Sequence, residues 1–150
     1  IGASVGSLLF GYLSQSLQSR KKALYIALTS LVFFMLVYFF NSGMTSGFFY
    51  ALITAMGLSM GGMWAIFMVK SSEQFGTNIR ATVTTTAPNF VRGMVLPISW
   101  MIGWMSGISN LWTAGLVTGL ICMVLSFIGI HYSKETYGKD LDYSEGSKLL

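Results

Sequence analysis

Charged side chains are scarce in this sequence. Only 9% of the 150 residues are Asp, Glu, Lys or Arg, whereas 53% are hydrophobic and 15% are aromatic. An ordinary soluble domain carries roughly 25% charged residues, because its surface faces water. The apolar residues here also occur in long uninterrupted blocks, and the mean hydropathy is +0.65. This composition excludes a water-soluble globule and predicts an integral membrane protein of the all-α class.

Residues that carry chemistry are few as well. The chain has one cysteine, Cys122, which cannot form an internal disulfide, and one histidine, His131. No Asp or Glu lies within the long apolar blocks, whereas an enzyme needs a nucleophile beside a base or a cluster of ligands. We therefore expect no enzymatic activity, no metal and no cofactor. The net charge of +4 comes without an aromatic-interleaved basic patch, so we expect no nucleic-acid partner.

Five apolar blocks make up most of the chain. They cover residues 1–13, 23–40, 47–69, 82–105 and 111–130. The last four are each close to the roughly 20 residues that a helix needs to cross a bilayer. The first block is too short, so we expect it to be a truncated helix in the C-terminal piece of a longer protein. The sequence thus predicts five transmembrane helices followed by a tail, residues 132–150.

The connections between these blocks differ in charge. Residues 41–46 and 106–110 hold no charge, whereas residues 14–22 and 70–81 hold five of the basic residues, which are Arg20, Lys21, Lys22, Lys70 and Arg80. An even number of crossings puts the tail on the same side as the two basic connections. Because basic loops stay in the cytoplasm, we expect a multi-pass protein of the cell (inner) membrane with a cytoplasmic C-terminus.

Glycines four residues apart predict where helices approach one another closely. The pairs are Gly2 and Gly6, Gly57 and Gly61, and Gly115 and Gly119.

Arg92 is a charge inside a predicted span. It lies 12 residues after Arg80, which is about 18 Å further along a helix and near the midplane of the bilayer. A charge at that depth costs roughly 2.5 to 3.5 kcal/mol, so we expect Arg92 to face a cavity and to orient an anionic or polar solute group. In the alternative interpretation, the helix starts nearer Pro88 and Arg92 snorkels to the cytoplasm.

Both prolines of the chain, Pro88 and Pro97, flank Arg92 in the same predicted helix. Each removes a backbone donor and frees a carbonyl one turn earlier, and a membrane tolerates this only beside neighbours, polar side chains or water. We therefore expect a kinked helix beside a wet cavity. Asn89 is a candidate solute contact next to Arg92.

The block 47–69 is rich in glycine at its centre and carries Trp64 and Ser59 there. A tryptophan at that depth either stacks on a solute or packs under close glycines, and the sequence does not decide between the two. Trp64 and Ser59 are therefore further candidate solute contacts.

Three segments resemble motifs of the major facilitator superfamily. Residues 11–22, GYLSQSLQSRKK, are similar to its Gly-x-x-x-Asp-Arg-x-Gly-Arg-Arg loop, although Gln15 and Ser16 stand in place of Asp and Arg. Residues 73–81, EQFGTNIRA, look like the Glu-x-Phe-Pro-Thr-x-x-Arg-Ala segment of its sugar-porter-like branch. Residues 134–141, KETYGKDL, look like the Pro-Glu-Thr-x-Gly-Lys-x-Leu tail of that branch. Gly76 and Lys134 replace the two prolines of these motifs.

The resemblance implies that the chain holds helices eight to twelve of such a carrier and that a missing N-terminal half completes it. It also implies a latch that holds the cytoplasmic helix ends together, although topology signals and solvated loop charges are the simpler alternative. The candidate latch residues are Arg20, Lys21, Glu73, Arg80 and Glu135.

The expected function is secondary active transport of a small polar or anionic solute by alternating access, within surrounding membrane lipid. A sugar, a sugar acid and another organic anion are the candidate solutes, and a proton or sodium ion is the candidate coupling ion. The alternative is a non-transporting membrane subunit or receptor of related fold, which would not need a broken helix or a charge at the midplane.

Overall fold

The structure is a computed structural model that describes residues 1–142. Within this range the chain folds into helices and contains no strand, which confirms the predicted all-α class. The helices in chain order are α1 (Gly2–Ser16), α2 (Arg20–Phe40), α3 (Ser46–Glu73), α4 (Thr77–Gly93), α5 (Val95–Ile108) and α6 (Leu111–Tyr132). The part of the predicted tail from residue 143 to residue 150 lies outside the described residues.

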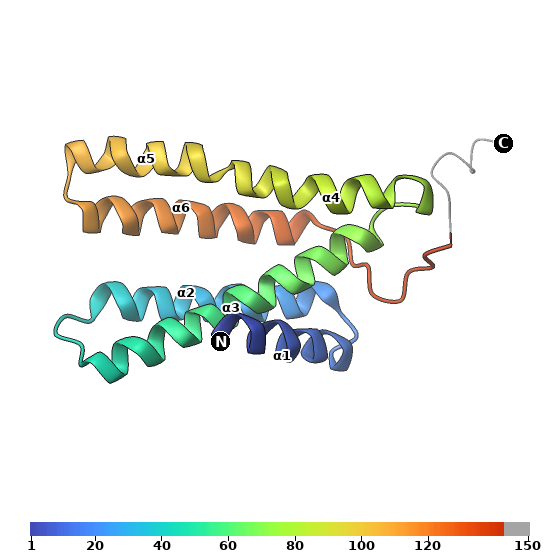
Figure 1. Cartoon of the computed structure of the whole chain (residues 1–150), viewed down its shortest axis with the longest axis horizontal. Coiled ribbons are helices and arrows are strands. Elements are labelled where there is room, and N and C mark those ends of the chain that lie inside the picture. Colours follow the sequence, from blue (N-terminus) through green and yellow to red (C-terminus); the bar gives the residue numbers. More distant parts are fainter. Residues whose placement is uncertain (143–150) are drawn as a thin grey trace.

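The connections between the helices lie at two opposite ends of the structure (Figure 1). The α1–α2 connection, the α3–α4 connection and the segment after α6 lie at one end, which we call the charged end. Contacts join all three, because Arg20 pairs with Glu73 and Arg80 donates to the carbonyl of Leu141. The α2–α3 and α5–α6 connections lie at the opposite end. The basic connections and the start of the tail therefore share one end, as the loop charges predict.

Three helices are long and apolar enough to cross a membrane by length and composition, namely α2, α3 and α6. The other helices of the described range are shorter: α1 has 15 residues, α4 has 17 and α5 has 14. In Figure 1, α4 and α5 follow one another in nearly the same direction, and α5 packs beside α6.

The single continuous helix predicted for residues 82–105 is wrong. Instead α4 ends at Gly93 and α5 begins at Val95, with Met94 between them. Pro97 accounts for the division, because it has no N–H to donate to the carbonyl of Gly93, which lies four residues earlier. The amide of Met94 donates to the carbonyl of Val91 at 3.2 Å, a tighter turn than that of an α-helix.

The predicted connection at residues 70–81 is also too long. Helix α3 continues to Glu73 and α4 starts at Thr77, so only residues 74–76 separate them. Carbonyls at the end of a helix have no partner within it. Here Arg80 folds back and its Nε donates to the carbonyls of Ser72 and Phe75 at 3.1 and 3.2 Å, which stabilises the sharp turn.

Helices α1 and α3 pack through glycine. A Cβ added at Gly6 would lie 2.0 Å from the carbonyl oxygen of Leu58, and one added at Gly61 would lie 2.1 Å from that of Ala3. The two backbones therefore touch where the glycine pairs predict a close approach. The third pair, Gly115 and Gly119, faces side chains of α2 instead of backbone.

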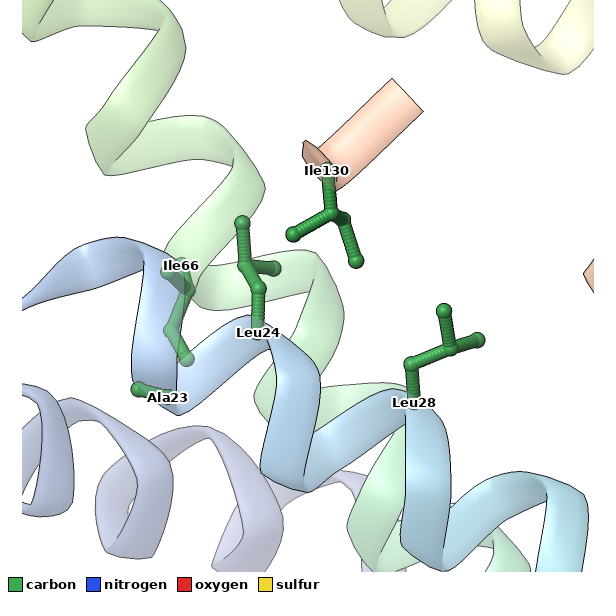
Figure 2. Close-up of a cluster of buried hydrophobic side chains, with 5 residues drawn as sticks. All are labelled: Ala23, Leu24, Leu28, Ile66 and Ile130. Atoms are coloured by element: carbon green, nitrogen blue, oxygen red, sulfur yellow. The ribbon is translucent and has the colours of Figure 1, made fainter. Parts of the chain in front are cut away.

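A buried apolar cluster joins three helices (Figure 2). It contains Ala23, Leu24 and Leu28 of α2, Ile66 of α3 and Ile130 of α6. No side chain of α5 is buried, so α5 contributes nothing to this core.

Candidate functional site

An ion pair holds the start of α2 to the end of α3. Arg20 Nη2 lies 2.9 Å from Glu73 Oε1, and Arg20 Nε lies 3.2 Å from the same oxygen. Both side chains are only 10% exposed. A buried charge needs a partner and further hydrogen bonds to offset the loss of water, and this pair has both.

Neighbouring groups complete that pair. The hydroxyl of Ser14 at the end of α1 accepts a hydrogen bond from Arg20 Nη1 at 3.0 Å, and Thr136 Oγ1 donates to Glu73 Oε2 at 2.7 Å. The ring of Tyr137 lies 5.2 Å from the guanidinium carbon of Arg20. Side chains from α1, α2, α3 and the segment after α6 thus meet around one arginine.

Glu135 caps the N-terminus of α2. Its carboxylate accepts the backbone N–H groups of Arg20 at 2.9 Å and Lys21 at 3.1 Å, together with the hydroxyl of Ser19. The first N–H groups of a helix have no partner within it and carry partial positive charge, so a carboxylate is stable there. Burial alone would raise the pKa of Glu135, but these hydrogen bonds and those from the amides of the next two residues lower it to about 2.

The remaining predicted latch residues lie at the same end. Lys21 Nζ donates to the carbonyl of His131 at the end of α6, and the backbone N–H of Lys21 donates to Glu135. Arg80 has separate partners, which are the carbonyls of the α3–α4 turn and of Leu141. Four of the five predicted residues therefore come together, and Arg80 holds the adjoining turn.

Sequence reasoning missed the uncharged partners at this end. Ser14, Ser19 and Thr136 are all buried, and each bonds a charged side chain of the group. Lys70 is also buried, and its Nζ donates to the hydroxyl of Ser133 at 2.8 Å. The one available signal was Ser19 directly before a basic run, because serine is favoured as the residue that caps a helix N-terminus.

Three predicted solute contacts lie together further along the bundle. Arg92 of α4 has its guanidinium carbon 5.7 Å from the ring of Trp64 on α3. Asn89 Oδ1 accepts from Arg92 Nη1 at 3.3 Å, and Asn89 Nδ2 donates to the carbonyl of Thr85 at 3.1 Å. We call Arg92, Asn89 and Trp64 the Arg92 site.

The Arg92 site is open. Arg92 and Asn89 are exposed, and Trp64 is 37% exposed. Among the described residues, no carboxylate pairs with Arg92. The site therefore presents a guanidinium with donors to spare, beside an aromatic ring and an amide.

Ser59 does not join the Arg92 site. It is 2% exposed, and its hydroxyl lies 2.8 Å from the hydroxyl of Ser30 on α2. The structure thus places Ser59 in the α2–α3 interface.

The two prolines flank the Arg92 site. Pro88 is buried inside α4, four residues before Arg92, and Pro97 lies in the first turn of α5. The helix break at Met94 between them comes two residues after Arg92.

Over residues 1–142, these observations define an all-helical structure with three helices long and apolar enough to span a membrane, a closed charged end and an open cationic site. Comparison with models of protein families, with curated proteins and with solved structures gives no significant match.

Proposed function

We propose that this chain is part of a membrane carrier that moves a small polar or anionic solute by alternating access. The observation that carries the proposal is the Arg92 site. Arg92 has no carboxylate partner among the described residues, lies two residues from a helix break, and contacts Trp64 on α3, a helix long and apolar enough to cross a membrane. Ionisable residues within membrane helices usually mark solute or ion pathways, and discontinuous helices are common at carrier binding sites.

The chemistry of the Arg92 site suits a carboxylate, phosphate or polyhydroxylated solute. A guanidinium offers five N–H donors in a planar fork that matches an oxyanion. Asn89 adds an acceptor and a donor, and Trp64 adds an apolar face for the carbon skeleton of a sugar or an organic acid. A sugar acid or another organic anion would use all three side chains.

The charged end supports an orientation and a role. In this proposal it faces the cytoplasm, because basic connections are retained there, and the segment after α6 is cytoplasmic with it. The group around Arg20 and Glu73 acts as a latch that keeps the ends of α1, α2 and α3 together while the opposite end opens. The fold proposed is a major-facilitator-type bundle of which this chain supplies the C-terminal part, and the sequence motifs at residues 11–22, 73–81 and 134–141 support it.

Uptake by an Arg92 variant tests the proposal. The full-length protein is reconstituted into vesicles and assayed with a panel of carboxylate, phosphate and neutral sugar solutes. Arg92→Leu should lower uptake of the transported solute by about 10- to 100-fold, because a hydrogen bond to a charged group contributes roughly 1.5 to 3 kcal/mol. Arg92→Lys keeps the charge and should retain part of the uptake, and Leu125→Ala on the exposed face of α6 is the control.

Two results would count against the proposal. Unaltered uptake of every solute by Arg92→Leu would remove Arg92 from the solute pathway. No uptake by the wild-type protein above empty vesicles would favour the alternative of a non-transporting subunit or receptor.

A further inference from the structure

Arg20 shows how this chain surrounds a guanidinium group. Its Nε lies 3.2 and 3.3 Å from the two carboxylate oxygens of Glu73, and its Nη2 lies 2.9 Å from one of them. Its Nη1 donates to the hydroxyl of Ser14 at 3.0 Å, and the ring of Tyr137 lies 5.2 Å from the guanidinium carbon. The carboxylate therefore takes the edge formed by Nε and Nη2, whose two parallel donors match two carboxylate oxygens.

Arg92 has two of these three kinds of partner. Its Nη1 donates to Oδ1 of Asn89 at 3.3 Å, and the ring of Trp64 lies 5.7 Å from its guanidinium carbon. Among the described residues, no group accepts a hydrogen bond from Nε or Nη2 of Arg92, and no carboxylate pairs with it. The edge that pairs with Glu73 in Arg20 therefore keeps both of its donors available in Arg92.

Asn89 holds the guanidinium of Arg92 in place. Nδ2 of Asn89 donates to the carbonyl of Thr85 one turn earlier at 3.1 Å, while Oδ1 of Asn89 accepts from Arg92. One amide thus ties the guanidinium to the backbone of α4, and Trp64 contacts it from α3. A donor edge that is already held in position has less conformational freedom to lose when a ligand binds.

The charge of the Arg92 site matches one carboxylate. Arg92 is the one charged side chain among the three residues of the site, so a carboxylate at Nε and Nη2 balances it. A phosphate group carries about −1.5 to −2 charges at pH 7 and would leave the site negative. A neutral hydroxyl would leave the arginine uncompensated. Uncompensated charge is costly inside a membrane, so both alternatives are less favourable than a carboxylate.

We propose that the solute of the Arg92 site carries a carboxylate, which Nε and Nη2 of Arg92 bind side-on as the same two atoms of Arg20 bind Glu73. The proposal rests on the proposed function, because it names the chemical group that the carrier recognises. Asn89 is a positioning residue that holds Nη1, and Trp64 supports the guanidinium from α3.

Two sets of matched compounds test which group is recognised. Glucuronate, glucose and glucose 6-phosphate share a hexose skeleton, and benzoate, benzyl alcohol and phenyl phosphate share a phenyl ring. Affinity is measured by calorimetric titration of the full-length protein in neutral detergent. We expect at least one carboxylate to bind at least about tenfold more tightly than both compounds of its set, because it matches the donor edge and the charge together. Equal or tighter binding by another member of each set would overturn the proposal, as would no binding by either carboxylate.

Variants of the Arg92 site test where the carboxylate binds. Arg92→Gln should weaken carboxylate binding about tenfold or more, and Arg92→Lys should recover part of it, because it keeps the charge without the two-donor edge. Asn89→Asp supplies a carboxylate from the chain itself and should weaken binding about tenfold, whereas Asn89→Ala only releases Nη1 and should weaken it about two- to threefold. Milder loss in Asn89→Asp than in Asn89→Ala would contradict this assignment, since Asp keeps the shape of Asn.

A basic residue outside the site supplies the control. Lys22→Gln removes an exposed positive charge at the charged end and should change carboxylate affinity less than about twofold. Equal weakening by Lys22→Gln and Arg92→Gln would overturn the proposal, because diffuse charge would then explain the affinity.

Uptake of the same compounds into vesicles separates this proposal from the carrier function. Carboxylate binding that depends on Arg92 but leads to no uptake would support the carboxylate assignment and contradict the carrier function. Uptake of a neutral or phosphate compound at least as fast as that of its matched carboxylate, and lost in Arg92→Gln, would support the carrier function and overturn the carboxylate assignment.

Discussion

The two regions formed by α1–α3 with the charged end and by α4 with α5 differ in how far their charged side chains are buried and paired. Around α1–α3 and the charged end, backbones touch through Gly6 and Gly61, and the buried Arg20 has a carboxylate, a hydroxyl and a ring around it. Along α4 and α5, no side chain of α5 is buried and Arg92 has no carboxylate partner among the described residues. The first region is closely packed and its charges are paired, whereas in the second region the guanidinium of Arg92 is exposed and accessible to a ligand.

Arg20 and Arg92 illustrate this difference. The same side chain is a structural element when it is buried with its partners and a candidate binding group when it is exposed beside Trp64 and Asn89. Substitution of Arg92 is therefore expected to affect binding, whereas substitution of Arg20 or its partners is expected to affect stability.

The largest expected effect comes from breaking the buried ion pair. Glu73→Gln leaves Arg20 buried without a carboxylate, and removing one partner of a buried pair costs about 3 to 5 kcal/mol. Arg92→Gln removes an exposed charge and should change stability by less than about 0.5 kcal/mol. Unfolding in detergent, followed by tryptophan fluorescence, measures both. Equal losses in the two variants would erase the distinction between the regions.

The next effect concerns glycine. Gly6→Ala forces a methyl group against the backbone of Leu58 and should destabilise the protein by about 1 to 3 kcal/mol. Gly103 of α5 has no neighbouring atom within 4 Å of an added Cβ, so Gly103→Ala should be neutral or stabilising by up to about 1 kcal/mol. The same unfolding assay compares them, and a larger loss at Gly103 would show that α5 is packed more tightly than the account holds.

The smallest effect depends on pH. The folded state lowers the pKa of Glu135 from 4.5 to about 2, so its capping contribution is fully present above pH 4.5 and is lost as the pH falls toward 2. Removal of a helix cap costs about 1 kcal/mol. Glu135→Gln should therefore be less stable than the wild-type protein above pH 5, and the difference should shrink toward pH 2.

Ser19→Ala removes one donor to Glu135 and should give an intermediate pH profile. A difference between wild type and Glu135→Gln that stays constant from pH 6 to pH 2 would contradict the capping role.

Composition and block length were enough to predict the helical class and most helix positions. The apolar runs that became α2 and α6 are almost the predicted ones, because length and hydropathy alone decide them. The helix break at Met94 was harder to place, since Pro88 lies inside the continuous α4 and only Pro97, in the first turn of α5, lies close to the break. The short α3–α4 turn was missed because it depends on Arg80 reaching back to two carbonyls.

The candidate sites were predictable to different degrees. Arg92 and Asn89 are three residues apart on a helix, so their contact follows from helical spacing. Trp64 meets Arg92 only through the packing of α3 on α4, which the sequence left open. Ser59 is turned toward Ser30, because each buried hydroxyl needs a partner and the neighbouring helix supplies one. At the charged end, the contacts of Ser19 with Glu135 and of Thr136 with Glu73 join residues more than 50 positions apart.

Water accessibility beside Arg92 tests the central claim most directly. In a Cys122→Ser background, Asn89→Cys and Leu125→Cys place one thiol in the Arg92 site and one on the exposed apolar face of α6, where Leu125 is 62% exposed. The full-length protein in vesicles is treated with a membrane-impermeant maleimide. If the Arg92 site faces a water-filled solute pathway and Leu125 faces lipid, position 89 is labelled rapidly and position 125 is labelled little. Labelling at position 89 as slow as that at position 125 would place the Arg92 site in lipid and contradict the account.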